Sequence, residues 1–236
     1  MKFVWASGTH VGRIRNQNED SLFPETSGAG PGPLLVAVAD GMGGHVGGEV
    51  ASQVAIETAT ADSPESPHSR IASANAAVLA RAQEEPELRG MGTTLTLAIL
   101  TDSGAEVGHV GDSRGYLFRE GALTRITDDH SYVEFLRREG RLSDEDIAHH
   151  PMRHVVMRAL GLEEEVDIDT YHQDLQPGDR ILLCSDGLTG MVPDAGISEI
   201  LGAEPAAEAV VWSLIEAANS AGGTDNTTVV LVDVEA

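Results

Sequence analysis

Basic residues, cysteine and long apolar runs are all scarce in this sequence of 236 residues. Its 15 lysines and arginines stand against 38 aspartates and glutamates, which gives a formal net charge of −23. Such a chain repels phosphate backbones and anionic lipid, because nucleic-acid binding depends on cations that neutralise phosphates. We therefore expect no nucleic-acid partner and no membrane partner. Binding of a phosphorylated ligand would need an arginine or metal ions.

The single cysteine, Cys184, rules out an intramolecular disulfide bond, which is compatible with a reducing compartment. No apolar run reaches the roughly 18 residues that span a membrane, and residues 1–5 lack the apolar core of a signal peptide. A cytoplasmic protein is the default expectation. With 41% hydrophobic residues the chain can still bury a sizeable core, in one or at most two domains.

Seven runs have the character of strands, at residues 2–6, 34–39, 93–100, 105–110, 115–119, 180–184 and 227–234. Helical spacing of apolar residues appears at 48–61, 66–83 and 206–219. These segments do not alternate strand with helix as a doubly wound fold does, and neighbouring runs resemble hairpins. The sequence therefore favours an α+β fold of antiparallel sheets covered by helices, with Trp5 and Trp212 in the core.

Two segments interrupt this pattern. Residues 127–161 are charged and contain two capping-box pairs, Ser131 with Glu134 and Ser143 with Asp146, which predict a small helical insertion between strands. Residues 27–33 are rich in glycine and proline and predict a turn that joins two strands.

The glycine-rich segment 40–49 follows a buried apolar run and precedes a predicted helix. Such a loop suggests phosphate binding. However, Val46 stands where a dinucleotide fingerprint needs glycine, and the lysine of a Walker loop is missing. Asp40 at the end of a buried strand suits a hard cation better, and the glycines beside it would let a backbone carbonyl turn toward the same ion. A plain Asp-Gly turn is the structural alternative.

The same arrangement recurs at the ends of other apolar runs, where an aspartate adjoins glycine or asparagine, at Asp112, Asp186 and Asp225. Near the N-terminus, Arg15, Glu19 and Asp20 lie at the start of a possible strand. Each could be an ordinary turn, but strand ends of packed sheets can converge at one edge. No histidine or cysteine cluster with zinc spacing accompanies them, and ligation by oxygen alone favours Mg²⁺ or Mn²⁺.

Taken together, these motifs resemble the PPM/PP2C family of Ser/Thr protein phosphatases, in particular its compact bacterial members. The matching segments occur in the family's order along the whole chain, at 15–20, 40–49, 91–94, 110–114, 185–187 and 225–228. The resemblance implies one catalytic domain over residues 1–236, built as a four-layer α-β-β-α sandwich of two mainly antiparallel sheets flanked by helices. It also implies that segment 127–161 is a flap beside the site that affects substrate choice.

The resemblance further implies a metal centre that uses Mn²⁺ or Mg²⁺. Asp40 would bridge two ions with help from the Gly41 carbonyl, and Asp186 and Asp225 would complete their ligands. A third, weaker ion would be held by Asp112 together with Asp186.

The remaining roles also follow from the resemblance. Glu19 and Asp20 would act mainly through bound waters, and Arg15 would grip the substrate phosphate, for which its planar fork is well shaped. Two ions about 3.5–4 Å apart lower the pKa of a shared water, and the resulting hydroxide would attack phosphorus directly.

The general acid is an open question in the sequence. Eukaryotic relatives have a histidine two places after the bridging aspartate, and Met42 stands there in this chain. His45 is the natural substitute as a hypothesis, and a metal-bound water is the alternative. His150 and His154 have i, i+4 spacing, but Pro151 lies between them and no third ligand follows, so we interpret them as surface residues of the flap.

Two function classes other than an active phosphatase are alternatives. A regulatory pseudophosphatase would bind phosphoproteins without turnover, but such proteins lose metal carboxylates and this chain keeps Asp40, Asp186 and Asp225. A different two-metal hydrolase, such as a phosphodiesterase, fits poorly because no basic groove is evident. The expected partners are phosphorylated proteins, including a Ser/Thr kinase, and a monomer is the default.

Overall fold

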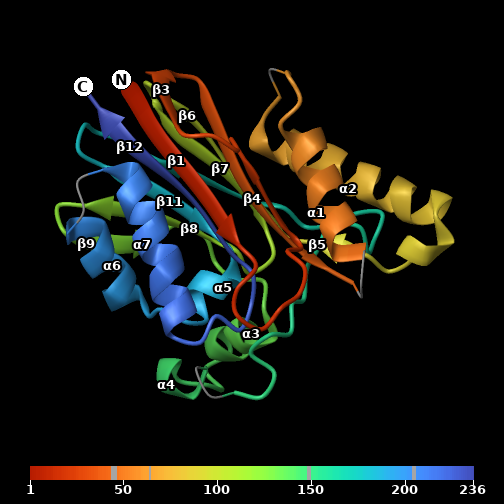
Figure 1. Cartoon of the computed structure of the whole chain (residues 1–236). Coiled ribbons are helices and arrows are strands. Elements are labelled where there is room, and N and C mark those ends of the chain that lie inside the picture. Colours follow the sequence, from red (N-terminus) through yellow and green to blue (C-terminus); the bar gives the residue numbers. More distant parts are fainter. Residues whose placement is uncertain (44–46, 64, 148–149, 204–205) are drawn as a thin grey trace.

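The computed structural model describes residues 1–43, 47–63, 65–147, 150–203 and 206–236. Two antiparallel sheets pack face to face, and helices cover both outer faces (Figure 1). One sheet has the order β3 (Gly28–Pro31), β1 (Lys2–His10), β12 (Thr227–Glu235), β11 (Arg180–Cys184), β8 (Arg114–Arg119) and β9 (Ala122–Arg125). The other has the order β10 (Asp169–Gln173), β7 (Gly104–Val110), β6 (Leu95–Thr101), β4 (Leu34–Met42) and β2 (Asp20–Phe23), and β5 (Gly92–Thr93) pairs with β4.

The helices lie in two outer layers and at one end. α1 (Gly47–Ala59) and α2 (Pro67–Glu84), followed by the 3-10 turn η1 (Pro86–Leu88), cover the sheet that contains β4. α6 (Asp194–Ala203) and α7 (Ala207–Ser220) cover the sheet that contains β12. The short helix α5 (Asp186–Thr189) and the flap helices α3 (Tyr132–Arg138) and α4 (Asp144–Ile147) lie toward the end of the sandwich away from the termini (Figure 1). The four-layer α+β prediction is therefore confirmed.

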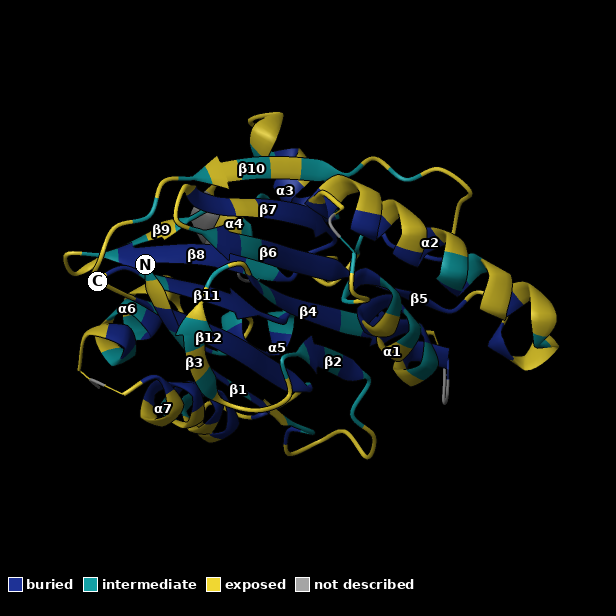
Figure 2. Ribbon diagram, turned by 90° about the horizontal axis from the view of Figure 1, so that it is seen from above, coloured by how far each residue is buried: buried dark blue, intermediate teal, exposed yellow. Residues whose placement is uncertain are grey.

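The apolar side chains form three clusters, one between the sheets and one under each helical layer. Figure 2 shows the central strands buried, while the helices expose their outward faces. Because both faces of β4 and β12 are covered, these strands are almost continuously apolar instead of alternating. Within the described part of the chain, no helix is long and apolar enough to cross a membrane.

Two local predictions were wrong. Residues 27–33 were expected to form a turn, but Gly28–Pro31 pairs with β1 as strand β3. A Cβ atom at Gly28 would lie 2.4 Å from the Trp5 ring, so the strand passes closely over the indole because glycine has no side chain. Trp212 was expected in the core and is 49% exposed, because α7 packs through Val210, Val211 and Leu214 instead.

The flap has both predicted helix starts. The Ser131 side chain accepts a hydrogen bond from the Glu134 backbone at 3.3 Å at the start of α3. At the second start, the Asp146 backbone donates to the Ser143 hydroxyl and the Asp146 carboxylate accepts from the Ser143 backbone, which completes the reciprocal pair. These caps fix the flap helices locally, although α4 is only one turn long.

Candidate metal centre

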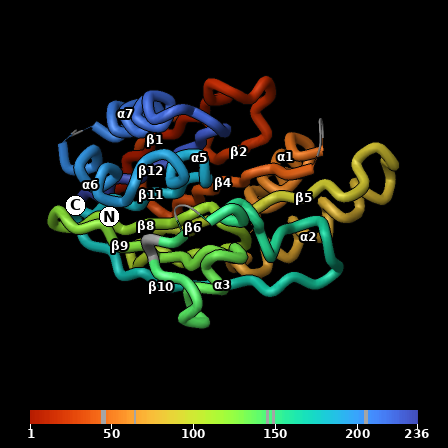
Figure 3. Tube along the Cα trace, turned by 90° about the horizontal axis from the view of Figure 1, so that it is seen from below, coloured from red at the N-terminus to blue at the C-terminus, as the bar shows by residue number. Residues whose placement is uncertain are grey.

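The predicted acidic residues lie where strands of both sheets end. Asp20 begins β2 and stands opposite Asp40 of β4 in the antiparallel pair. Asp186 follows β11 as the first residue of α5, and Asp225 lies two residues before β12. Figure 3 views the molecule from this end, with α5 near its middle between strands of the two sheets. Pairing of the strands therefore brings together residues that are far apart in the sequence.

The carboxylates are close enough to oppose one another's ionisation. Burial, followed by the charges of Asp20 and Asp186, raises the pKa of Asp40 well above its usual value. Burial and then the charge of Asp186 also raise the pKa of Asp112. Burial and the charge of Asp225 raise the pKa of Asp186, against a hydrogen bond with Asp40 that lowers it. Like charges held this close favour binding of a cation.

Asp20 gives the clearest test of whether a cation fits. Its Oδ2 accepts a hydrogen bond from Ser185 at 2.8 Å, and Ser185 is itself held by the Thr228 backbone at 3.0 Å. Its Oδ1 is buried and has no hydrogen-bond partner among the described residues. Burial raises the pKa of Asp20 to about 7. A buried carboxylate oxygen without a donor is costly, and a metal ion or its water ligand would satisfy it.

Gly41 is needed for the close packing of this site. Its backbone N–H donates to the Glu19 carbonyl at 3.1 Å. A Cβ atom at position 41 would lie 2.0 Å from the Gly48 carbonyl oxygen at the start of α1. The Glu19 carboxylate also lies against Gly48, since a Cβ there would be 2.6 Å from Glu19 Oε1. Both glycines thus allow α1, β4 and the Glu19 strand start to meet. In the part of the chain that the structure describes, no three or more His, Cys, Asp or Glu side chains are grouped closely enough to hold a metal ion. We refer to Asp20, Asp40, Asp112, Asp186 and Asp225 together as the carboxylate edge.

Asn226 is a site residue that the sequence analysis missed. Its amide nitrogen donates to the carbonyls of Val11 and Gln17, each at 2.9 Å, and its oxygen accepts from the Glu19 backbone at 2.8 Å. One buried side chain therefore holds both ends of the segment that carries Arg15. The only signal in the sequence was its position next to Asp225, because its partners lie more than 200 residues away.

Replacing Asn226 by alanine is expected to lower the free energy of unfolding by about 2–3 kcal/mol, because the backbone groups of Val11, Gln17 and Glu19 lose their partner. Urea unfolding of the metal-free protein measures this loss. Asn16→Ala is the matched control, since Asn16 is exposed in the same segment. Equal stability of the two variants would contradict the role of Asn226.

Arg15 is already engaged in the structure. Its guanidinium donates to Asp225 Oδ2 at 2.7 Å, and its side chain is 49% exposed. The hydrogen bond with Asp225 raises the pKa of Arg15 despite some desolvation. The ion pair places the Arg15 guanidinium beside the carboxylate edge. There it can exchange the Asp225 carboxylate for a phosphate group.

Asp112 lies in the turn between β7 and β8, and His130 fixes this turn to the start of the flap. The His130 backbone donates to the Gly111 carbonyl at 2.7 Å, and the Gly111 backbone donates to His130 Nδ1 at 3.1 Å. His130 Nε2 is 3.2 Å from Asp169 Oδ2. Since Nδ1 accepts, Nε2 carries the proton that bonds Asp169. The flap and the Asp112 turn are therefore held as one unit.

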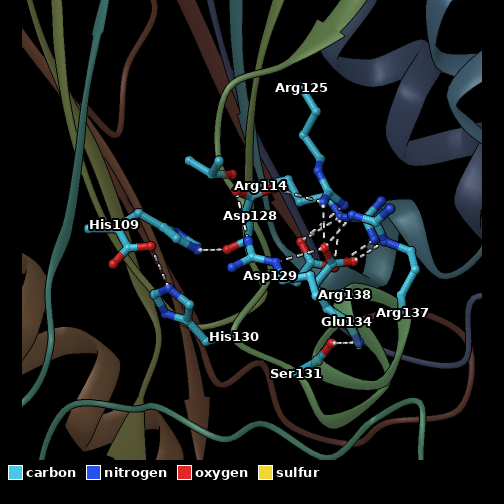
Figure 4. Close-up of polar contacts among 12 residues, drawn as sticks. His109, Arg114, Arg125, Asp128, Asp129, His130, Ser131, Glu134, Arg137 and Arg138 are labelled. Carbon is cyan, nitrogen blue, oxygen red and sulfur yellow. Dashed lines mark hydrogen bonds and ion pairs between the residues drawn. The ribbon is translucent and has the colours of Figure 1, made fainter. Parts of the chain in front are cut away.

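A cleft of about 640 Å³ runs from Asp112 and Asp186 to the flap. A cluster of arginines and carboxylates borders it (Figure 4). Arg114 is held by Asp129 at 2.9 and 2.7 Å. His154 also lines the cleft, whereas the predicted proton donor His45 lies outside the described residues.

Comparison with known proteins gives a consistent result. A sequence model of the protein phosphatase 2C family matches residues 8–203. The chain is 43% identical over 239 residues to the serine/threonine phosphatase stp of Listeria innocua, covering 95% of this chain and 93% of that protein. The crystal structure of the Mycobacterium tuberculosis serine/threonine phosphatase PstP is 40% identical, with a TM-score of 0.89 over 100% of both chains. A structure of the PstP catalytic domain in complex with 2 manganese ions is 39% identical, with a TM-score of 0.84 over 99% of this chain and 100% of that one.

Proposed function

The chain belongs to the protein phosphatase 2C family and is a metal-dependent serine/threonine protein phosphatase, and from this premise we propose how its own residues build the active centre. Asp40 would be shared by two divalent ions, and the Gly41 carbonyl, Asp186 and Asp225 would be their further ligands. The observation that carries this assignment is the set of carboxylates that raise one another's pKa at one edge of the sandwich. Manganese in the related PstP catalytic domain supports Mn²⁺ or Mg²⁺ as the ions.

When bound, two divalent ions supply charge to the phosphoryl oxygens and lower the pKa of a water between them. Glu19 and Asp20 would act at the ions mainly through bound water, and the unpartnered Asp20 Oδ1 supports this role. Ser185 keeps the Asp20 carboxylate turned toward the centre through its hydrogen bond. Asn226 fixes the position of Glu19 by accepting a hydrogen bond from its backbone.

Arg15 binds the substrate phosphate. Its guanidinium contacts Asp225 at 2.7 Å in this structure. With Asp225 serving as a metal ligand, the guanidinium would be available to two phosphoryl oxygens. Charge-assisted bidentate bonds of this kind fix the phosphoryl group for direct attack.

Asp112 and Asp186 would hold a third, weaker ion beside the flap. The support is that the charge of Asp186 raises the pKa of Asp112, which lies almost fully buried at the cleft. His130 keeps the Asp112 turn in place through Gly111.

His45 supplies the proton to the leaving oxygen. His45→Ala should then slow substrates with poor leaving groups much more than those with good ones, and equal losses would refute this role.

Phosphorylated proteins are the substrates of this class of enzyme, and we propose that a Ser/Thr kinase is among them. We also propose that residues 1–236 act as one monomeric catalytic domain. Size-exclusion chromatography with light scattering at micromolar concentration tests the monomer, and a dimer mass would exclude it.

Hydrolysis of a phosphothreonine peptide is expected to require added Mn²⁺ or Mg²⁺ and to stop with EDTA. The reason is that the carboxylates of the centre repel a bare phosphate, and Arg15 is already paired with one of them, Asp225. Phosphate release with each metal, and recovery after Mn²⁺ is added back to the EDTA-treated enzyme, measures this. Turnover that persists in excess EDTA would overturn the proposed centre.

A further inference from the structure

The cleft beside the metal centre is rich in arginine for a protein in which basic residues are scarce. Although the chain has only 15 basic residues in total, four arginines line this one cleft, namely Arg114, Arg125, Arg137 and Arg153. Apart from Asp112 and Asp186 of the metal centre, its acidic lining is limited to Asp129, Glu134 and Asp194. Arginines are therefore concentrated in this cleft, where they lie among carboxylates.

The arginines of this cleft differ in how firmly they are held. Arg114 makes close bonds to Asp129 at 2.9 and 2.7 Å. Arg137 makes close bonds to Glu134 at 2.9 and 2.6 Å. Arg125 approaches three carboxylates only at 3.4–3.6 Å and makes no closer ion pair within the described residues. Charge-assisted hydrogen bonds of arginine are normally about 2.7–2.9 Å. The neighbouring carboxylates therefore position Arg125 but leave part of its hydrogen-bonding capacity unused.

The carboxylates next to Arg125 have closer partners than Arg125, although its charge is one of the causes that lower the pKa of Glu134. The hydrogen bond from Arg137 lowers the pKa of Glu134 to about 2, and Arg138 also contacts this carboxylate at 3.3 Å. Asp129 is satisfied by Arg114. Figure 4 shows Arg125 on one side of this group, with Glu134, Arg137 and Arg138 on the other. A small movement of Arg125 toward a ligand would therefore leave no buried carboxylate uncompensated.

We propose that Arg125 forms a second anion subsite in this cleft, which receives an acidic side chain or a second phosphoryl group near the phosphorylated residue of a peptide substrate. The inference rests on the phosphatase function and adds a substrate preference to it. A peptide whose phosphoryl group occupies the metal centre would lie next to the cleft, since Asp112 and Asp186 form part of the same lining as Arg125. At about 3.3–3.6 Å per extended residue, side chains within a few positions of the phosphothreonine come within reach of the cleft.

The test uses phosphothreonine peptides that carry glutamate, phosphoserine, alanine or lysine at each of the three positions on either side. The measured quantity is the ratio of kcat/KM for each charged peptide to that for the alanine peptide, with the Mn²⁺-loaded full chain. We expect about a tenfold preference for glutamate or phosphoserine at one or two positions, the range of one hydrogen bond to a charged group. Arg125→Gln should abolish this ratio, and Arg125→Lys should restore part of it, because lysine keeps the charge but not the planar fork.

Arg138→Gln is the matched control. Arg138 belongs to the same cluster and pairs with Asp128 at 2.7 Å, but it does not line the cleft. This variant should keep the preference of the wild type. A wild-type enzyme that hydrolyses all peptides equally, or an Arg138→Gln variant that loses the preference as Arg125→Gln does, would overturn the inference. Failure to hydrolyse even the alanine peptide would instead count against the phosphatase function, so the two failures are distinguishable. A preference for phosphoserine without one for glutamate would identify the second group as a phosphoryl group.

Discussion

Asp186→Asn is expected to reduce kcat/KM for a phosphothreonine peptide by at least about 1000-fold at saturating Mn²⁺. Asparagine has nearly the same shape but one anionic ligand fewer, so the shared site loses charge for the ions that Asp186 and Asp225 are proposed to hold. Loss of several kcal/mol of transition-state stabilisation corresponds to this factor, since each 1.36 kcal/mol is tenfold. Steady-state phosphate release measures it, and manganese binding by calorimetry shows whether an ion is lost.

The same substitution should make the metal-free protein more stable. Burial and the charge of Asp225 raise the pKa of Asp186, so its ionised form is unfavourable in the folded state without a cation. Asp174→Asn is the control, because Asp174 is 90% exposed and lies outside the centre. Asp174→Asn should change kcat/KM less than about threefold, as expected for a surface substitution. An Asp186→Asn variant with wild-type activity would rule out its role as a ligand.

The elements that could be predicted from the sequence are those whose pattern is local. The apolar run at 34–39 became β4, and the periodic segments became α1, α2 and α7 within a few residues. Asp20, Asp40 and Asp186 stand out because each adjoins a strand end, and strand pairing brings Asp20 opposite Asp40. In such cases the local pattern of apolar residues is enough to predict the strand or helix.

The elements that escaped prediction depend on partners far away in the chain. β3 exists because Gly28 passes over Trp5, and β10 pairs with β7 although its exposed residues alternate with only partly buried ones. Asn226 acts through backbone groups at the opposite end of the chain. Glu134 of α3 is only 4% exposed beneath arginines, which the charged character of segment 127–161 does not indicate. No local pattern carries information about these contacts.

The stability of the metal-free protein is expected to fall by at least about 1 kcal/mol between about pH 6.5 and pH 8.5. Burial raises the pKa of Asp20 to about 7, above its ordinary value of 3.8, so folding favours the protonated carboxyl. Stability from such a group is complete below about pH 4, falls as the pH rises from there, and is lost once the pH has passed through about 7. The pKa values of Asp40 and Asp112 are raised in the same direction and extend the loss to higher pH.

The histidines set the lower limit of this window. Burial lowers the pKa of His109 to about 4 from its ordinary 6.5, so its contribution is lost as the pH falls through this range. That contribution opposes the effect of Asp20 below about pH 6.5 and is constant above it. The aspartates therefore determine the slope between about pH 6.5 and pH 8.5, which is why the measurement belongs there.

Manganese should reverse this slope, because each bound ion replaces the proton that the carboxylates otherwise retain. At a concentration of about 100 times its Kd, one ion stabilises the folded state by about 2.7 kcal/mol, and the gain should grow from pH 6 to pH 8 as protons cease to compete. Urea unfolding with EDTA and with Mn²⁺ at each pH measures both slopes. Asp20→Asn is the internal check, since it removes one titrating group and should flatten the metal-free decline. A rise in the stability of the metal-free protein from pH 6.5 to pH 8.5 would contradict this prediction. It would show that the buried carboxylates do not repel one another, so that a cation would have no such repulsion to relieve.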